Sequence, residues 1–253
     1  MKTRVGKIPY LNSEPFYYRM VRDDIELISL VPSDLSRAAE AGEIDAGPVP
    51  IVDCFRLEDR FTQLGQFCIA TLDKARSILL YSKRPIHDLG GATIGITGET
   101  STSRRLLQVL LAYRFEVEPK EYVTLKDEHD AFLLIGDEAL RRRYGVPGYP
   151  YRYDLGEEWH KWTKMPFVFA LWVVDKNMPK KRMTYLENVL YTCVDEGLEH
   201  MSLIGQMRED VRMSTREIVE YYQGFRYWAG VGEIKAMAKF REYLTSLGLI
   251  SAP

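Results

Sequence analysis

Hydrophobic and polar positions alternate in short blocks along the first ninety residues. Apolar runs predict strands at 4–8, 25–31, 44–50, 67–71 and 77–82. Between them, helix signals appear at Pro15, from Ser33 to Gly42, and over 51–55. Strands that alternate with helices in this way are typical of an α/β layer with a largely parallel sheet.

A second block with the same alternation begins near Pro85. Apolar runs predict strands at 92–97, 122–125, 131–135 and 167–174. Leucines at helical spacing predict a helix through 106–111, and Asp137 is expected to cap the start of another helix. The segment 144–162 is rich in Tyr, Pro and Gly and is expected to be irregular.

Everything after Asp175 is expected to be helical. Apolar stripes with helical spacing cover 186–201 and 234–247, and Ser214 with Glu217 forms a capping-box pattern between them. Each stripe is typical of a helix face that packs on a core.

Two similar α/β halves followed by helices predict two lobes with a ligand cleft between them. We expect residues 1–83 and 174–253 to form lobe one and residues 84–173 to form an inserted lobe two. The strands 77–82 and 167–174 would cross between the lobes and act as a hinge.

Composition and charge exclude several functional classes. The 253 residues include 34 basic and 36 acidic side chains, which argues against a dedicated nucleic-acid binder. Three cysteines without a Cys-x-x-Cys pair fit a reducing compartment and predict no metal site. The N-terminus has no signal-peptide core, and the apolar run 165–174 is half the length of a membrane span, so we expect a cytoplasmic protein without a membrane partner.

Three loops carry the candidate chemistry. Thr100-Ser101-Thr102-Ser103 opens a helix, where free N–H groups and hydroxyls attract an anion, although one of them would suffice as a plain helix cap. Ala46-Gly47-Pro48 lets a ligand approach the backbone, or is an ordinary turn. The loop Ile8–Pro15 places the Asn12 amide and the Ser13 hydroxyl directly after the first strand.

These loops belong to a longer set of segments that covers nearly the whole chain. In order, they are Ile8-Pro9-Tyr10-Leu11-Asn12-Ser13, Asp45-Ala46-Gly47-Pro48-Val49-Pro50, Ser77-Ile78-Leu79-Leu80, Ile135-Gly136-Asp137-Glu138-Ala139-Leu140 and Asp154-Leu155-Gly156-Glu157-Glu158-Trp159, followed by Pro166–Ala170. The sequence thereby resembles the chorismate dehydratase family of the futalosine route to menaquinone. The resemblance implies a type II periplasmic-binding-protein-like fold and a reaction that converts chorismate to 3-enolpyruvylbenzoate and water without a cofactor.

The resemblance and the loops together assign candidate residues. Asn12 and Ser77 are the candidate catalytic residues, expected to stabilise charge that develops on the substrate. The candidate substrate-binding residues are Tyr10, Ser13, Gly47, Pro48, Arg76, Thr100, Ser101, Thr102, Ser103, Asp137 and Phe169. Asp137 is equally explained as a helix cap, and Phe169 as a core residue. The base is left open, and one possibility implied by the family is the enolpyruvyl carboxylate of the substrate itself.

Two other functions compete with this one. The same fold commonly serves solute-binding proteins, which close on a small anion without chemistry. A sister enzyme of the same route acts on cyclic dehypoxanthine futalosine, but it carries a different first loop. The sequence does not decide between a monomer and a homodimer.

Overall fold

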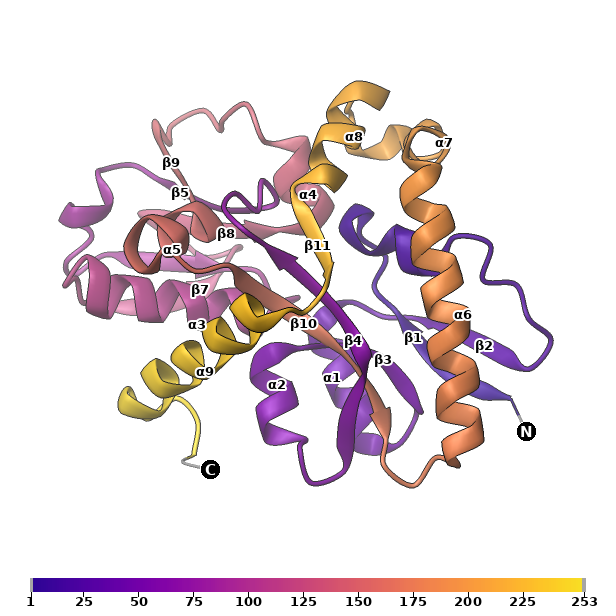
Figure 1. Ribbon diagram of the computed structural model, residues 1–253. Helices are drawn as coiled ribbons and strands as arrows, with labels where there is room; N and C mark the ends of the chain where they lie inside the picture. The colour runs from indigo at the N-terminus through magenta and orange to yellow at the C-terminus, as the bar shows by residue number, and fades with distance from the viewer. Residues whose placement is uncertain (1, 252–253) are drawn as a thin grey trace.

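The structure, a computed structural model that describes residues 2–251, is built around two β-sheets joined twice by the chain (Figure 1). The strands are β1 (Thr3–Lys7), β2 (Ile25–Ser29), β3 (Ala46–Pro50), β4 (Phe61–Thr71), β5 (Ile78–Ser82), β6 (Thr93–Ile96), β7 (Glu121–Thr124), β8 (Ala131–Ile135), β9 (Tyr151–Asp154), β10 (Phe167–Asp175) and β11 (Phe225–Trp228). The α-helices are α1 (Pro32–Ala41), α2 (Ile51–Arg56), α3 (Thr102–Val109), α4 (Gly136–Arg141), α5 (Leu155–Thr163), α6 (Lys180–Glu199), α7 (Met201–Gln206), α8 (Thr215–Gln223) and α9 (Val231–Ser246). The short 3-10 helices η1 (Leu11–Tyr17), η2 (Ile86–Asp88) and η4 (Glu209–Val211), and the π-helical turn η3 (Leu110–Arg114), complete the chain.

The first sheet, which defines lobe one, has the strand order β11-β4-β10-β3-β1-β2. β1 is parallel to β2 and β3, whereas β10 runs antiparallel to both β3 and β4. All residues of β10 except Asp175 are buried, which is why the run 167–174 reads as continuously apolar.

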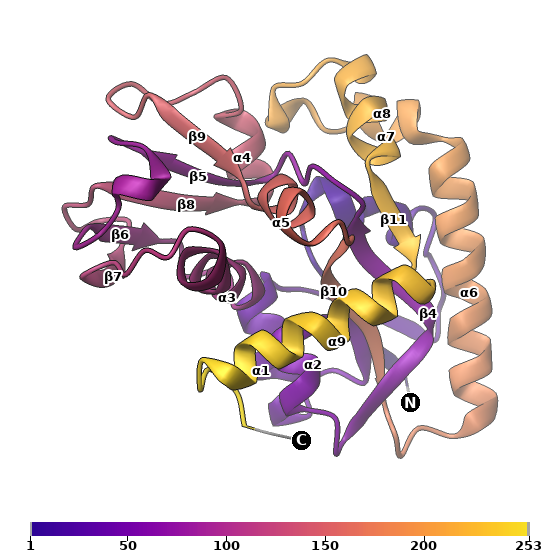
Figure 2. The ribbon, with the colours of Figure 1, turned by 60° about the vertical axis from the view of Figure 1, so that its left-hand side comes forward.

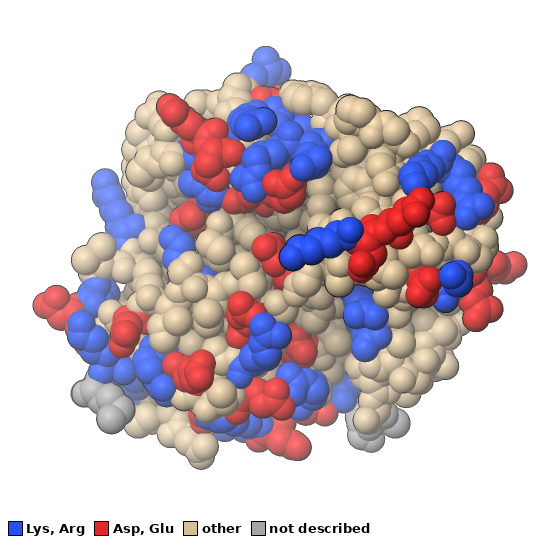
Figure 3. Space-filling view, turned by 180° about the vertical axis from the view of Figure 1, so that it is seen from behind, with Lys and Arg blue, Asp and Glu red and all other residues tan. Residues whose placement is uncertain are grey.

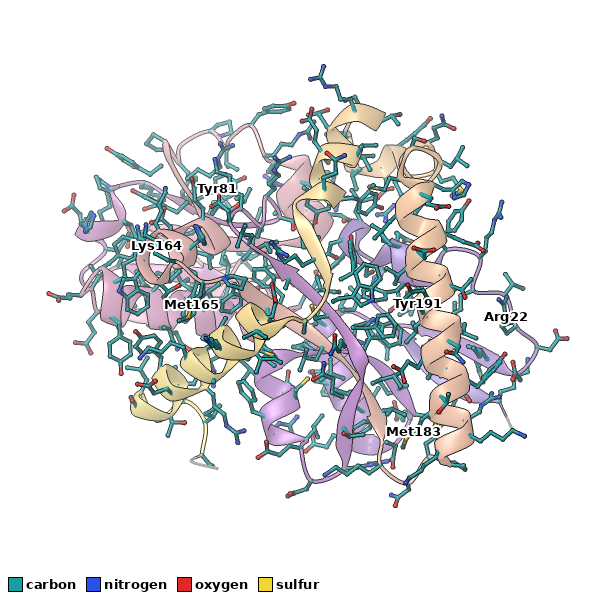
Figure 4. All side chains as sticks on the ribbon, viewed as in Figure 1. Arg22, Tyr81, Lys164, Met165, Met183 and Tyr191 are labelled. Carbon is teal, nitrogen blue, oxygen red and sulfur yellow. The ribbon has the colours of Figure 1, made fainter. Side chains whose placement is uncertain are left out.

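The second sheet, which defines lobe two, has the order β7-β6-β8-β5-β9. β6 is parallel to β7 and β8, and β5 is antiparallel to β8 and β9. On one face of this sheet Tyr81, labelled in Figure 4, stacks on Phe132 within a small apolar cluster. The other face joins a core that continues into lobe one.

Sheet membership corrects two of our strand assignments. β5, expected within lobe one, pairs along its whole length with β8 and β9 of the second sheet. β10, expected to lie in lobe two up to residue 173, pairs with β3 and β4 of the first sheet. The chain therefore passes between the sheets at 72–77 and returns through α5 and the residues up to 166.

Asp154 holds these two crossings together. Its carboxylate accepts hydrogen bonds from the backbone N–H groups of Ala75 (3.0 Å) and Arg76 (2.6 Å) in the outward crossing. As the N-cap of α5 it also accepts from the N–H groups of Gly156 and Glu157. Gly156 is tightly enclosed, because a Cβ there would lie 2.8 Å from the carbonyl oxygen of Asp73.

The helices cover both sheets and link them. α6 packs against η1 and β4 in lobe one, while α9 crosses from β10 and α2 to α3 of lobe two (Figure 2). Among the described residues, no helix combines the length and the hydrophobicity that a bilayer crossing needs. In the view from behind, basic and acidic side chains are interspersed over the surface (Figure 3).

Several element predictions need correction. The segment 144–162 is not irregular throughout, because it contains β9 and most of α5. The tail after Asp175 is not wholly helical, because β11 extends the first sheet beside β4. The predicted capping box of Ser214 and Glu217 is confirmed at α8.

Two predicted helix starts also differ. The first loop turns helical at Leu11, ahead of the expected start at Pro15, which places Asn12 inside η1. Asp137 is not an N-cap, since that position of α4 belongs to Ile135. Its carboxylate is used elsewhere, as described below.

Candidate functional site

A cavity lies between the two sheets, where the loops after strands of both lobes meet. Its volume is about 60 Å³, well below the roughly 300–1,000 Å³ that is usual for small-molecule sites, so the surrounding side chains almost fill the cleft. Its lining consists of Ile8, Tyr10, Asn12, Pro32, Pro50, Ile69, Ser77, Ile78, Thr100, Ser101, Thr102, Ser103, Ile135, Gly136, Phe169 and Ala170. Eight of the thirteen sequence-predicted site residues are among them.

The first loop brings Tyr10 and Asn12 to the cavity because η1 is fixed at its start. The Ser13 hydroxyl donates to the carbonyl oxygens of Ile8 (2.5 Å) and Tyr10 (2.9 Å), which ties the turn to the end of β1. The Asn12 carbonyl oxygen accepts from the Tyr227 hydroxyl at 3.1 Å. With the backbone held in this way, the side-chain Oδ1 of Asn12 is buried without a hydrogen-bond partner among the described residues.

The four hydroxyls at the start of α3 have different partners. Thr100 Oγ1 accepts from the Ser103 N–H at 3.1 Å and so serves as a local cap. Ser101 donates to Asp53 of lobe one at 2.6 Å. Thr102 is buried, and its hydroxyl has no partner among the described residues. One hydroxyl therefore caps the helix, and the Thr102 hydroxyl is left without a partner among the described residues, so anion binding at this helix start stays a prediction.

Ser77, at the end of the outward crossing, and Phe169, on β10, both line the cavity. Ser77 is buried just before β5, and its hydroxyl oxygen lies 2.7 Å from the Tyr221 hydroxyl and 3.2 Å from the Ala75 carbonyl oxygen. Phe169 lies on β10 with its ring 4.7 Å from that of Phe167. The cavity lining thus combines polar residues, among them Asn12, Ser77 and the start of α3, with apolar ones such as Phe169.

Five predicted site residues do not line the cavity. Ser13 is occupied by the turn described above. Gly47 and Pro48 lie inside β3, where a Cβ on Gly47 would come within 3.2 Å of the Gly6 Cα. Arg76 is exposed, with φ +58°, and contributes its backbone N–H to Asp154.

Asp137, the fifth of these residues, is buried and belongs to a partly exposed ion-pair cluster beside the cavity. Its carboxylate accepts from the Leu11 N–H at 2.9 Å and pairs with Arg208, which also pairs with Glu14 at 3.2 Å and with Asp210 at 2.8 Å. Burial raises the pKa of Asp137, and the Leu11 N–H and the Arg208 guanidinium act in the opposite direction. The cluster joins α4 of lobe two to η1 of lobe one, so its evident role is to hold the lobes together.

Further contacts join the two lobes. The Tyr10 hydroxyl of lobe one donates to the Glu99 carboxylate of lobe two, and the Ser33 N–H donates to the Glu99 carbonyl oxygen at 3.2 Å. Burial, and then the bond to Glu99, raise the pKa of Tyr10 well above its ordinary value, so this phenol stays protonated. Together with the Ser101–Asp53 bond, these contacts bridge the two lobes across the cleft.

Comparison with known proteins identifies the family. Residues 3–246 match a protein family described as menaquinone biosynthesis. The chain belongs to this family. This confirms the resemblance predicted from the sequence.

Proteins that are similar to this chain in sequence or in structure support the fold described above. A protein of Thermus thermophilus named chorismate dehydratase is 27% identical over 98% of this chain and 96% of its own length. A solved protein from Archaeoglobus fulgidus has a TM-score of 0.79 at 18% identity, covering 98% of both chains. The periplasmic aliphatic sulphonate-binding protein of Escherichia coli has a TM-score of 0.67 at 11% identity, covering 99% of this chain and 89% of its own. The two-lobe, periplasmic-binding-protein-like fold is thereby confirmed.

Sequence reasoning missed several apolar residues of the cavity lining in this family member. Ile69, Ile78 and Ile135 stand at strand ends and have the same pattern as core residues, so no sequence signal marks them as ligand contacts. Gly136 was missed as well: its only sequence signal is a glycine directly after a strand, and the structure gives the reason for it, a φ of +59° and a position where a Cβ would lie 2.8 Å from the Tyr10 ring. The described residues that line the cavity include no charged side chain.

Proposed function

We propose that this protein is a chorismate dehydratase, which converts chorismate to 3-enolpyruvylbenzoate and water. The observation that carries the proposal is the pair of buried, unpartnered polar atoms in the cavity, Asn12 Oδ1 and Thr102 Oγ1. Buried polar atoms without partners are rare in proteins and are expected where a ligand completes the hydrogen bonding. The relative named chorismate dehydratase supports the choice of ligand.

The chemistry of chorismate fits these two atoms. The dianion has one hydrogen-bond donor, its ring hydroxyl, and two carboxylates that only accept. Asn12 Oδ1 is an acceptor for the ring hydroxyl, and the Thr102 hydroxyl is a donor for a carboxylate at the positive end of α3. The apolar residues of the lining, Phe169 among them, suit the flat ring.

In this proposal the protein positions the substrate and stabilises charge. Loss of the ring proton beside the enol ether oxygen leaves an anion delocalised onto the ring carboxylate. The bond between the ring carbon and the hydroxyl oxygen then breaks as the ring becomes aromatic, and the hydroxyl takes a proton back from the base and leaves as water. Donors around that carboxylate lower the barrier, each by about 3–4 kcal/mol when well placed. We assign the proton removal to the enolpyruvyl carboxylate of the substrate, since the described cavity lining contains no His, Lys, Asp or Glu.

The test is to incubate the purified protein with chorismate and to follow the loss of diene absorbance together with the appearance of an enolpyruvyl benzoate. A protein-free sample and a sample containing cyclic dehypoxanthine futalosine are the controls. Turnover of chorismate alone is the expected result. Binding of chorismate without turnover would favour a solute-binding protein and overturn the proposal, and turnover of the futalosine derivative would favour the sister enzyme.

A further inference from the structure

Ser77 is the one cavity-lining hydroxyl that is bonded to a side chain of the C-terminal helices. It precedes β5, and its carbonyl oxygen accepts from the Gly136 N–H at 2.8 Å, which fixes its backbone against α4. Its hydroxyl oxygen has two neighbours, the Tyr221 hydroxyl and the Ala75 carbonyl oxygen. Tyr221 comes from α8, 144 residues further along the chain.

The direction of the bond between the two hydroxyls follows from their surroundings. Tyr221 is buried, and among the described residues its hydroxyl has Ser77 Oγ as its partner. The phenol proton therefore points to Ser77, at 2.7 Å. Burial raises the pKa of Tyr221 far above its ordinary value, so the phenol keeps this proton and remains a donor.

A serine hydroxyl has a single proton, and the bond from Tyr221 leaves that proton for another acceptor. In this structure the proton points to the Ala75 carbonyl oxygen at 3.2 Å, which is longer than the usual O–H···O distance of about 2.5–3.0 Å. A substrate oxygen in the cavity would offer a better acceptor. We infer that Tyr221 is a positioning residue, which makes Ser77 a dedicated hydrogen-bond donor to the substrate oxygen that gains negative charge during dehydration.

The helix that carries Tyr221 is anchored to lobe two. The α8 residue Glu217 pairs with Arg143, which follows α4, at 2.9 Å and accepts from the Tyr144 hydroxyl at 2.6 Å. The ring of Tyr221 packs edge-on against Phe225 at 4.9 Å. The hydroxyl is thus held from both ends of α8, as a positioning role requires.

The inference rests on the proposed function, and the adjacent residue Tyr222 provides a matched control. Tyr222 lies on the same helix and is equally buried, but its hydroxyl has no partner among the described residues. Tyr221→Phe is expected to lower kcat about tenfold with little change in KM, because the serine proton loses its fixed direction. Tyr222→Phe is expected to stay within about twofold of the wild type. These effects are smaller than the roughly 10²–10³-fold loss for a direct donor.

A double-mutant cycle separates positioning from general support of the fold. Ser77→Ala is expected to lower kcat about 100-fold, and adding Tyr221→Phe to it is expected to cause no further loss. Two results would overturn the inference and leave the proposed function intact. One is a Tyr221→Phe substitution that lowers kcat equally in the wild-type and Ser77→Ala proteins, and the other is a Tyr221→Phe variant with wild-type kcat. A wild-type protein that does not convert chorismate overturns the proposed function first, and with it this role of Tyr221.

Discussion

Replacing Thr102 by valine should make the protein more stable and less active at the same time. Thr102 is 4% exposed, and its hydroxyl has no partner among the described residues. A buried hydroxyl without a hydrogen bond costs about 1–3 kcal/mol in proteins. Valine has nearly the same shape without that group, so the free energy of unfolding should rise by about 1 kcal/mol, or ~2–4 °C in Tm for a chain of this size.

The activity should change in the opposite direction. A hydrogen bond to a charged group contributes about 1.5–3 kcal/mol, so loss of the Thr102 hydroxyl should lower kcat/KM for chorismate by roughly 10–100-fold. Thermal unfolding of the ligand-free protein and steady-state kinetics measure the two effects.

Thr71 is a suitable control for this substitution. It is fully buried at the end of β4, and its hydroxyl has a partner, the Asp73 carbonyl oxygen at 3.4 Å. Because this bond is long, Thr71→Val should lower stability only slightly, by about 0.5 kcal/mol. If Thr102→Val unfolds at a lower temperature than the wild type, or keeps full kcat/KM, the assignment of this hydroxyl to a ligand is wrong.

Three further outcomes are expected. Asn12→Asp should lower kcat/KM for chorismate at least 100-fold, because it adds a carboxylate beside a dianion, and full activity would exclude the assigned role of this amide. Gly136→Ala should destabilise the protein by about 1–3 kcal/mol, measured by urea unfolding, because of its φ of +59° and its 2.8 Å contact with the Tyr10 ring; an unchanged midpoint would contradict the close approach. Glu217 has its pKa lowered to about 2 by the Tyr144 hydroxyl and then by the α8 capping contacts. The ionised Glu217 carboxylate should contribute its full stabilisation of the folded protein above the unfolded pKa of about 4.3, and this contribution should be lost as the pH falls toward 2. The difference in the free energy of unfolding between wild type and Glu217→Gln should therefore shrink over that pH range. A constant difference would refute the lowered pKa of Glu217.

The sequence predicted those parts of the site that depend on local chemistry. Four consecutive hydroxyls exceed what a helix cap needs, which predicts a ligand at the start of α3, and the unpartnered Thr102 hydroxyl is compatible with that prediction. The first loop could be recognised because Ile8–Ser13 carries part of the family resemblance and places the Asn12 amide after the first strand. In contrast, Asp137 has the sequence pattern of a helix cap. Its partner in the structure, Arg208, lies 71 residues further along the chain, so a local sequence pattern cannot predict this ion pair.

Long-range pairing explains the errors in the fold as well. β11 has only four residues and alternates buried and exposed positions between two helices, so its strand character comes from β4 beside it. β5 consists of five buried residues, and this pattern is compatible with a position in either sheet. Its pairing with β8 and β9 places it in the second sheet.

The position of β10 in the first sheet determines the order in which the lobes can form on the ribosome. β3 ends at Pro50 and its neighbour β10 begins at Phe167, so at about 5–20 residues per second synthesis takes roughly 6–23 s to supply the missing strand. All five strands of the second sheet are made within that interval. The middle of the chain can therefore fold before the beginning, and a nascent or truncated chain that ends before Phe167 exposes the unpaired edges of β3 and β4 to aggregation.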